Sequence, residues 1–391
     1  MARGLGPALA ALVLVLHIAH ATGLRNLLAA AVAAGAAYLL LRARQLPPLA
    51  LPAAAWIALG LASASSSPDA GATLKAVLYD SVLPFGAMWA AYLATRTAPQ
   101  SRALPAAIVA GAAFLAVLTA LAYLAGLATL LPEASGAGML YYFPGPGVSS
   151  TLCVFALPIV LVLLADDEAA ARRAGYAAGA CILVAGVGSL NRMFLPSATV
   201  VLAAFLLWYW PHLAPRRRKW AVVGVLACAL AAIGAVAMQT ATREHASVTG
   251  DVRLDSWREW GAVAGEAPLL GHGFGEKILA SLGKERISAG LAERELHLRS
   301  HAHNVFLDVA VQLGIAGLAV FSWLLAALVR VAWRTRGNRK ASAALLALVV
   351  AVVTKNLTDD FMHLAVAMAF WAYAGLLLGS LAPAAAATVP R

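Results

Sequence analysis

The feature that most constrains this chain is a succession of long apolar runs, separated by short segments that carry clusters of lysine and arginine. At about 1.5 Å per residue, each run can cross a hydrocarbon layer of about 30 Å as a helix, once tilt and helix ends are allowed for. Across the chain 62% of residues are hydrophobic and 12% are charged, whereas a soluble domain carries about 25% charged residues. The alternating segments of about ten residues that a transmembrane barrel needs are not seen. The sequence therefore predicts an all-α polytopic membrane protein with about 12 transmembrane helices, at approximately 5–22, 26–41, 48–64, 81–95, 103–131, 150–165, 175–190, 194–210, 220–240, 303–329, 341–354 and 364–383.

The positive charges predict the orientation of these spans. With a cytoplasmic N-terminus, 17 of the 29 Lys and Arg residues fall in inside segments and 4 in short outside loops, while the remaining 8 lie in the long loop 241–302. Cytoplasmic loops are enriched in Lys and Arg, so we expect both termini to be cytoplasmic. Topology thus accounts for the net charge of +11, and because no basic–aromatic module is present we expect no binding of nucleic acid.

The predicted spans divide the chain into three parts. Residues 1–240 hold transmembrane helices 1–9, residues 241–302 form a large outside loop, and residues 303–391 hold helices 10–12. A loop of this length within a compact protein is usually functional or disordered. Residues 1–22 also fit the pattern of a signal peptide, whose removal would leave the orientation of the later spans unchanged.

Part of the outside loop has the pattern of an amphipathic helix. Within 284–299, the apolar residues Ile287, Leu291 and Leu298 recur at near-helical spacing. We therefore expect a helix over 284–299, with one face packed on the membrane domain or on the bilayer surface.

The first candidate for chemistry is His303, in the segment SHAHNVFLDVAVQLGIAG over 300–317. As one continuous helix, this segment places His303 near the N-terminus and Gly314 about three turns further along. The positive end of the helix dipole disfavours imidazolium and leaves a neutral ring that can accept a proton, as a general base must. The alternative is a histidine that only caps a helix at the membrane interface.

The second candidate is Arg192, in the short turn GSLNRMFLPS between two spans. A turn this short holds the arginine close to the bilayer on the outside face, where an ionised group without a partner is costly. No carboxylate is near in sequence, so an anionic ligand such as a diphosphate is a natural partner for the guanidinium. Snorkelling to lipid head groups is the alternative.

Two further arginines, Arg253 and Arg258, flank Trp257 in GDVRLDSWREWGAV. As a helix, this segment places Arg253 and Trp257 on one face, four residues apart. The glycine-rich turn PLLGHGFG follows at 268–275 and could bring backbone amides to a phosphate or a sugar. A surface amphipathic helix is the alternative.

Other polar groups carry weaker predictions. Asp359 and Asp360, close to His363, could serve acid–base chemistry or bind a metal, but we expect them to form a solvated loop. His297 and His301 have the i, i+4 spacing of a metal site, yet no HExxH motif or suitably spaced carboxylate accompanies them, so no metal is expected. The sequence also lacks a Walker A motif and a GxSxG motif. An enzyme of this kind would need a donor that is already activated and held in the membrane.

Taken together, these elements resemble the bacterial O-antigen ligases. That family belongs to a superfamily with O-antigen polymerases and protein O-oligosaccharyltransferases. The resemblance rests on four elements. The first is the histidine–glycine signature, His303-Asn304 followed after nine residues by Gly314-x-x-Gly317, and the second is the outside arginine after a mid-chain span, Arg192. The others are the R-x-x-x-W element of Arg253 and Trp257 and the glycine-rich turn 268–275 before the histidine.

The resemblance implies glycosyl transfer on the periplasmic face of the bacterial inner membrane, from undecaprenyl diphosphate–linked O-antigen to a sugar hydroxyl of lipid A–core in lipopolysaccharide biosynthesis. It implies a metal- and ATP-independent inverting glycosyltransferase of the GT-C-like kind, without a cofactor. The catalytic residues it implies are His303 as base, with Arg192 and Arg253 on the diphosphate. The substrate contacts it implies are Asn304, Trp257, Arg258, Arg299 and His301.

Three other functions remain open at this point. An O-antigen polymerase or a protein O-oligosaccharyltransferase would use the same donor with a different acceptor. A transporter of an anionic substrate should place ionisable residues near the middle of its spans, where His17 is the clearest example.

Overall fold

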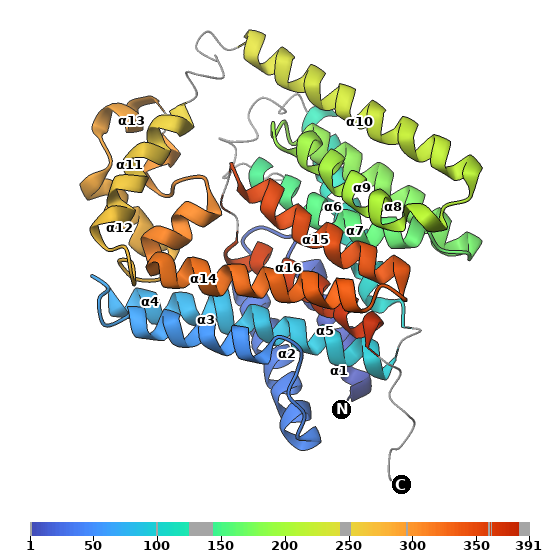
Figure 1. Cartoon of the computed structure of the whole chain (residues 1–391), viewed down its shortest axis with the longest axis horizontal. Helices are drawn as coiled ribbons and strands as arrows, with labels where there is room; N and C mark the ends of the chain where they lie inside the picture. Colours follow the sequence, from blue (N-terminus) through green and yellow to red (C-terminus); the bar gives the residue numbers. More distant parts are fainter. Residues whose placement is uncertain are drawn as a thin grey trace.

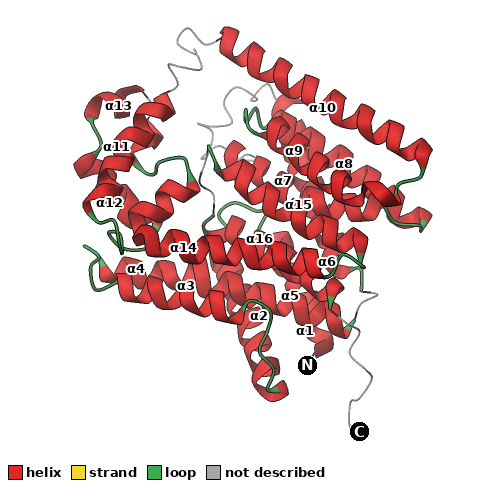
Figure 2. Ribbon diagram, viewed as in Figure 1, coloured by secondary structure: helices red, strands yellow, loops and turns green. Residues whose placement is uncertain are grey.

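The computed structural model of the chain consists of helices joined by loops (Figure 1), and no strand occurs among the residues that it describes (Figure 2), which are 2–98, 101–124, 144–242, 252–294, 296–358, 360 and 362–382. The all-α class predicted from the sequence is therefore confirmed. The helices are α1 (Ala2–Val15), α2 (Thr22–Ala43), α3 (Ala50–Ser63), α4 (Ala70–Val77), α5 (Leu83–Thr97), α6 (Ala103–Leu124), α7 (Pro146–Leu164), α8 (Ala169–Gly188), α9 (Phe194–Tyr209), α10 (Pro215–Thr242), α11 (Val252–Glu266), α12 (Glu276–Arg286), α13 (Ala289–Arg294), α14 (Val305–Arg334), α15 (Arg339–Asn356) and α16 (Leu364–Leu381).

Each predicted apolar run contains a helix over the residues described, although in the run 5–22 the helix α1 ends at Val15. Within the described part of the chain, eight helical segments are long and apolar enough to cross a membrane: Thr22–Ala43, Ala70–Thr97, Ala103–Leu124, Gly147–Leu164, Phe194–His212, Pro215–Ala237, Val305–Arg334 and Leu364–Leu381. A π-helical turn, Leu78–Val82, joins α4 to α5 within one of them. The chain is thus a polytopic membrane protein, while the predicted total of about 12 spans stays a prediction.

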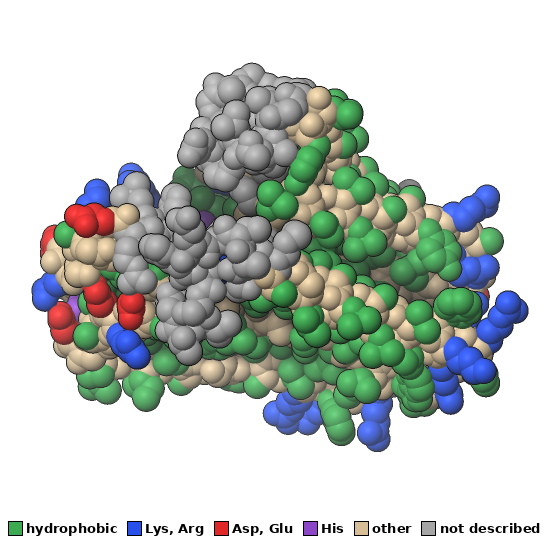
Figure 3. Space-filling view, turned by 90° about the horizontal axis from the view of Figure 1, so that it is seen from above, with side chains coloured by type: hydrophobic (Ala, Val, Ile, Leu, Met, Phe, Trp, Pro, Cys, Tyr) green, Lys and Arg blue, Asp and Glu red, His purple; other side chains and the backbone are tan. Residues whose placement is uncertain are grey.

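Three of the loops that the charge pattern assigns to the inside lie together at one end of the bundle, namely those before α6, before α8 and before α15. Lys340, at the start of α15, lies 3.5 Å from the Asp167 carboxylate between α7 and α8. Arg102, before α6, pairs with Glu168, the residue that precedes α8. On the face shown in Figure 3, Lys and Arg side chains lie at both ends, whereas most acidic side chains in view lie over α11–α13, so the end far from α11–α13 is the more purely cationic one.

The loops assigned to the outside meet at the other end. The ammonium of Lys355, near the end of α15, donates to the side chain of Asn191 between α8 and α9 over 3.3 Å. The amide of Leu364, at the start of α16, donates to Asp80 over 2.6 Å. This grouping is what the predicted alternation of loops requires, and the side of the membrane that each end faces stays a prediction.

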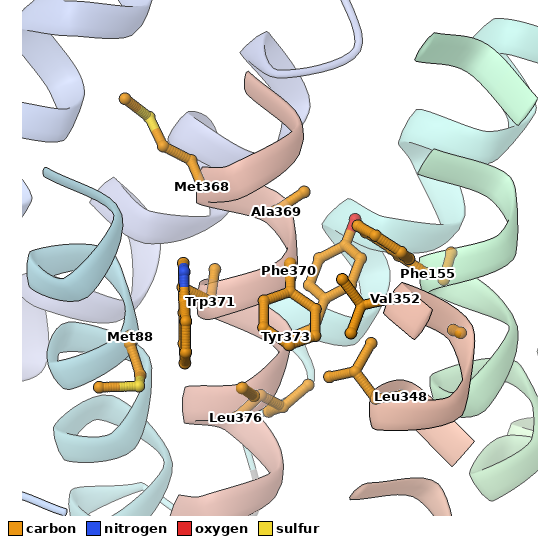
Figure 4. Close-up of a cluster of buried hydrophobic side chains, with 14 of the residues drawn as sticks. Met88, Phe155, Leu348, Val352, Met368, Ala369, Phe370, Trp371, Tyr373 and Leu376 are labelled. Carbon is orange, nitrogen blue, oxygen red and sulfur yellow. The ribbon is translucent and has the colours of Figure 1, made fainter. Parts of the chain in front are cut away.

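Helix α16 forms the centre of the bundle. Its residues from Val366 to Gly379 are all buried, and α5, α7 and α15 surround it. Gly375 and Gly379, four residues apart, face α5: a Cβ atom would lie 2.0 Å from the carbonyl oxygen of Met88 at the first and 2.8 Å from that of Tyr92 at the second. Small residues at this spacing let membrane helices approach closely. Figure 4 shows the buried side chains from these helices that fill the core, among them Phe155, Leu348, Phe370 and Tyr373.

The predicted continuous helix over 300–317 is wrong at Gly314. This glycine has φ 63° and ψ −160°, so α14 is two helical pieces joined at a kink. In an unbroken helix the amides of Ile315 and Ala316 would bond the carbonyls of Val311 and Gln312. All four groups instead bond the glycine-rich turn 268–275, which therefore replaces the interrupted helical hydrogen bonds.

The predicted helix over 284–299 is also wrong, because the segment is broken into three pieces. Helix α12 ends at Arg286, Ile287 is extended, and a short 3₁₀ turn covers Leu296–Arg299 after α13. The three apolar residues that suggested the helix are nonetheless buried, in a small core beneath α11 with Trp260 at its centre: Ile287, Leu291 and Leu298.

Candidate active site

His303 lies in the turn that leads into α14. Its φ of 52° is in the left-handed region, which is uncommon for a residue other than glycine, and its side chain is buried. The next residue, Asn304, is the N-cap of α14: its side-chain oxygen accepts the amides of Phe306 at 3.0 Å and Leu307 at 3.2 Å. The predicted position of His303 at the helix N-terminus is confirmed, and the Asn304 carboxamide oxygen is occupied by the cap.

His301 and Asp308 complete this turn. The rings of His301 and His303 lie with centroids 3.9 Å apart. Asp308, which is fully buried in α14, accepts the amide of Ala302 at 2.8 Å through Oδ1, and its Oδ2 lies 3.8 Å from Nδ1 of His301. The two histidines are therefore held as one unit against the first turns of α14.

A pocket adjoins this unit, between α3, α5, α12, α14 and the segment before α16. Its walls combine aromatic side chains, including Trp56, Phe274 and Phe321, with polar groups. Its volume of about 70 Å³ accommodates a few waters or the polar atoms of a ligand. The polar groups that line it are Asp80, Glu276, His301, Gln312, Asp360 and His363. Carboxylates of this kind accept hydrogen bonds from hydroxyl groups.

The expectation of a solvated loop is wrong for Asp360 and His363, because both are partly buried and line the pocket. Nδ1 of His363 lies 3.6 Å from a carboxylate oxygen of Glu276 in α12. The backbone amide of the next residue, Leu364, donates to Asp80 in the π-helical turn before α5. The segment before α16 therefore contacts both α12 and the turn before α5. Both are distant in sequence, so the local sequence pattern does not reveal these contacts. Asp359 lies outside the described residues.

Arg192 lies in the turn between α8 and α9, which is as short as predicted, and it is partly buried. Asn191 shapes this turn: its side-chain oxygen accepts the amide of Met193 at 3.0 Å and the ammonium of Lys355 at 3.3 Å. Lys355 has no exposed surface. It is one of the four Lys and Arg residues that the predicted topology places in short outside loops. The sequence pattern did not predict that a lysine is buried beside the Arg192 turn. The local sequence feature that could have indicated its burial is its position directly after the apolar run 341–354.

The predicted helix with Arg253 and Trp257 on one face is confirmed as α11, which packs against α14. Both side chains are partly buried. Arg258 instead points outward: its side chain is 81% exposed and lies 3.3 Å from Asp255. The two arginines of this helix therefore have different surroundings, since one is partly buried and the other lies in solvent.

Arg299 forms hydrogen bonds within the segment 241–302. Its guanidinium donates twice to the carbonyl of Ile287, at 3.3 Å and 3.1 Å, and so ties the 3₁₀ turn to the end of α12. Among the described side chains no three His, Cys, Asp or Glu groups are placed to hold a metal ion. The side chain of His297 lies outside the described residues.

The predicted site residues thus fall in separate places. His301, His303 and Asn304 form one turn, and α11 with Arg253 and Trp257 packs on the helix that follows it. Arg192 belongs to the α8–α9 turn, next to Asn191 and Lys355. These places lie at the same end of the bundle, the end formed by the predicted outside loops.

Comparison with known proteins gives one family. No curated protein matched the chain. The family model described as O-antigen ligase matches residues 177–322, which run from α8 to the middle of α14 and contain Arg192, Arg253, His303 and Gly314. Over this region the chain is similar to the O-antigen ligase family.

Proposed function

We propose that this protein is an O-antigen ligase, which transfers an O-antigen polysaccharide from undecaprenyl diphosphate to a sugar hydroxyl of lipid A–core at the periplasmic face of the inner membrane. The observation that carries the proposal is the position of His303. It lies within the matched region 177–322, in a strained turn at the N-terminus of α14 that several side chains hold in place.

The donor site is supported by the cations at the same end of the bundle. Arg192 lies in a tight turn shaped by Asn191, and Arg253 lies on the helix that packs against α14. Guanidinium groups match the geometry of phosphate oxygens and remain charged at all relevant pH values. In this role they bind the diphosphate and stabilise the charge that grows on it as the glycosidic bond breaks.

His303 supplies the base. The acceptor oxygen attacks the anomeric carbon of the donor sugar, the bond from that carbon to the diphosphate oxygen breaks, and undecaprenyl diphosphate leaves with the electron pair. The proton of the acceptor hydroxyl passes to the imidazole of His303. Attack from the face opposite to the leaving group inverts the anomeric centre. Because the diphosphate is already a good leaving group, the step needs neither ATP nor metal.

The pocket beside His301 supports a sugar acceptor. Its aromatic walls can lie against the apolar faces of a sugar ring, and the carboxylates of Asp80, Glu276 and Asp360 can accept from hydroxyl groups. Carboxylates repel phosphate groups. The carboxylates therefore favour a neutral acceptor sugar over the diphosphate in this pocket. The diphosphate would bind at Arg192 and Arg253 instead.

The experiment that tests the function offers both lipids to the purified protein in liposomes, with a chelator and without ATP. The donor is undecaprenyl diphosphate–linked O-antigen and the acceptor is lipid A–core. A ligase converts lipid A–core to a glycan-bearing product of higher mass. Elongation of the lipid-linked glycan, with the core left bare, would identify a polymerase. Transfer to a protein acceptor alone would identify an O-oligosaccharyltransferase, and movement of a lipid or anion without covalent change would identify a transporter.

A further inference from the structure

His303 has a backbone conformation that a residue with a side chain rarely adopts. A positive φ at such a position persists only where the surroundings fix it. Asn304 caps the helix on one side of His303. On the other side, the amide of Ala302 needs an acceptor, and the acceptor comes from within α14.

That acceptor is Asp308. Its side chain has no exposed surface, and Oδ1 accepts the Ala302 amide at 2.8 Å. The amide of Asp308 itself donates to the carbonyl of Asn304 at 2.9 Å. One buried residue therefore bonds the chain on both sides of His303 and closes the turn.

The second carboxylate oxygen of Asp308 faces the imidazole ring of His301, which lies next to His303. Oδ2 lies 3.8 Å from Nδ1 of His301, and the His301 ring lies against the His303 ring with an interplanar angle of 46°. The amide of His303 lies 3.3 Å from the same Nδ1. At 3.8 Å, Oδ2 faces Nδ1 of His301 without a hydrogen bond to it, and the His301 ring lies between Asp308 and His303.

We propose that Asp308 is the positioning residue for His303, acting through the Ala302 amide on the backbone and through His301 on the imidazole. Asp308 is too deeply buried to touch a substrate, so it is not itself a catalytic residue. The orientation of His303 decides whether its ring meets the acceptor hydroxyl. This inference rests on the proposed function for the kinetic effect, and on geometry alone for the placement of the ring.

Two variants separate the contact with the Ala302 amide from the contact with His301. Asp308→Asn keeps the shape and, through Oδ1, the acceptor for the Ala302 amide, but it turns an NH₂ group toward Nδ1 of His301 in place of the second carboxylate oxygen. We expect an unchanged Tm, a KM within about threefold of wild type and a kcat lowered about tenfold to a hundredfold, the range that misplacement of a catalytic group produces. Asp308→Ala removes both contacts, and we expect a lower Tm. Asp167→Asn, an exposed carboxylate at the opposite end, is the matched control and should change neither quantity.

The placement of His303 is measured without substrate. The full-length protein in nanodiscs is treated with diethyl pyrocarbonate, and modification of His303 is followed by mass spectrometry. We expect His303 to react at least about tenfold faster in Asp308→Ala than in wild type or Asp167→Asn, since a released ring samples solvent. An unchanged rate overturns the proposal, whatever the transfer assay gives. If Asp308→Ala does not fold, Asp308→Asn decides: a wild-type kcat overturns the proposal. Failure of wild type to transfer glycan at all refutes the proposed function and leaves the modification rate as the test of the positioning.

Discussion

The kink at Gly314 provides the sharpest test of how the site is built. Replacement of Gly314 by alanine adds a Cβ atom that would lie 2.4 Å from the carbonyl carbon of Leu269 and 2.7 Å from the amide nitrogen of Leu270. Both are backbone atoms of the glycine-rich turn and cannot rotate away. The φ of 63° with ψ of −160° is in addition a region that is essentially restricted to glycine.

The two effects add. Holding alanine in this region costs about 1–3 kcal/mol, and forcing an extra methyl group into a packed site costs about 1–3 kcal/mol. The Gly314→Ala variant should therefore be about 2–6 kcal/mol less stable, a large part of the roughly 5–15 kcal/mol of a folded protein. At about 2 °C per kcal/mol, Tm falls by about 4–12 °C.

The assay is thermal unfolding of the purified protein in detergent, with transfer of glycan measured in parallel. Gly224→Ala is the matched control, because a Cβ atom there meets nothing within 4 Å. Activity should fall in Gly314→Ala at temperatures where the protein is still folded, because the displaced turn carries Phe274 and Gly275 of the pocket wall. A Gly314→Ala protein with the Tm and the activity of wild type would refute the role of the kink.

Three further outcomes follow from the contacts. Arg253→Ala should lower kcat/KM for the donor lipid at least about tenfold, the scale of a lost charge-assisted contact, whereas Arg258→Ala, which is exposed, should stay within about twofold; equal losses would contradict their different surroundings. Lys355→Met removes a buried ammonium that donates to Asn191. The variant should have a lower Tm, because loss of one partner of a buried polar contact is destabilising, and a higher KM for the donor, because the Asn191 turn is loosened; an unchanged Tm and KM would contradict this. Gly271→Ala, at φ 66° with a Cβ atom 2.3 Å from the Gln312 backbone, should lower Tm as Gly314→Ala does, and a stable variant would show that the turn can move.

The membrane helices could be predicted because their signal is local. Lipid as a solvent requires continuous apolar runs with internally bonded backbone, so each run in the sequence coincides with a helix. The break at Gly314 is different, because its stabilisation comes from the turn 268–275, about 40 residues earlier in the chain. A glycine inside an apolar run is compatible with a helix on its own. Only the partner that takes over its hydrogen bonds makes the kink favourable.

The site divides in the same way. The place of His303 near a helix N-terminus could be predicted from the polar residues ahead of an apolar run, whereas the cap by Asn304 is seen only in the structure. The segment 284–299 could not, because its apolar residues pack around Trp260 from three short pieces rather than from one helical face. The burial of Lys355 and the approach of His363 to Glu276 depend on how distant helix ends meet. Such contacts are set by the packing of the bundle and leave no trace in spacing.

The central claim is that transfer of glycan to lipid A–core depends on the imidazole of His303. The most direct measurement compares wild type with His303→Asn in liposomes that contain donor and acceptor, because asparagine tolerates the left-handed backbone that this position requires and removes only the base. His212→Asn, at the opposite end of the bundle, is the control. The account predicts a folded His303→Asn protein whose kcat is lowered at least about a hundredfold, the contribution of a general base, while the control and wild type convert the core equally. Transfer by His303→Asn at the wild-type rate would contradict it.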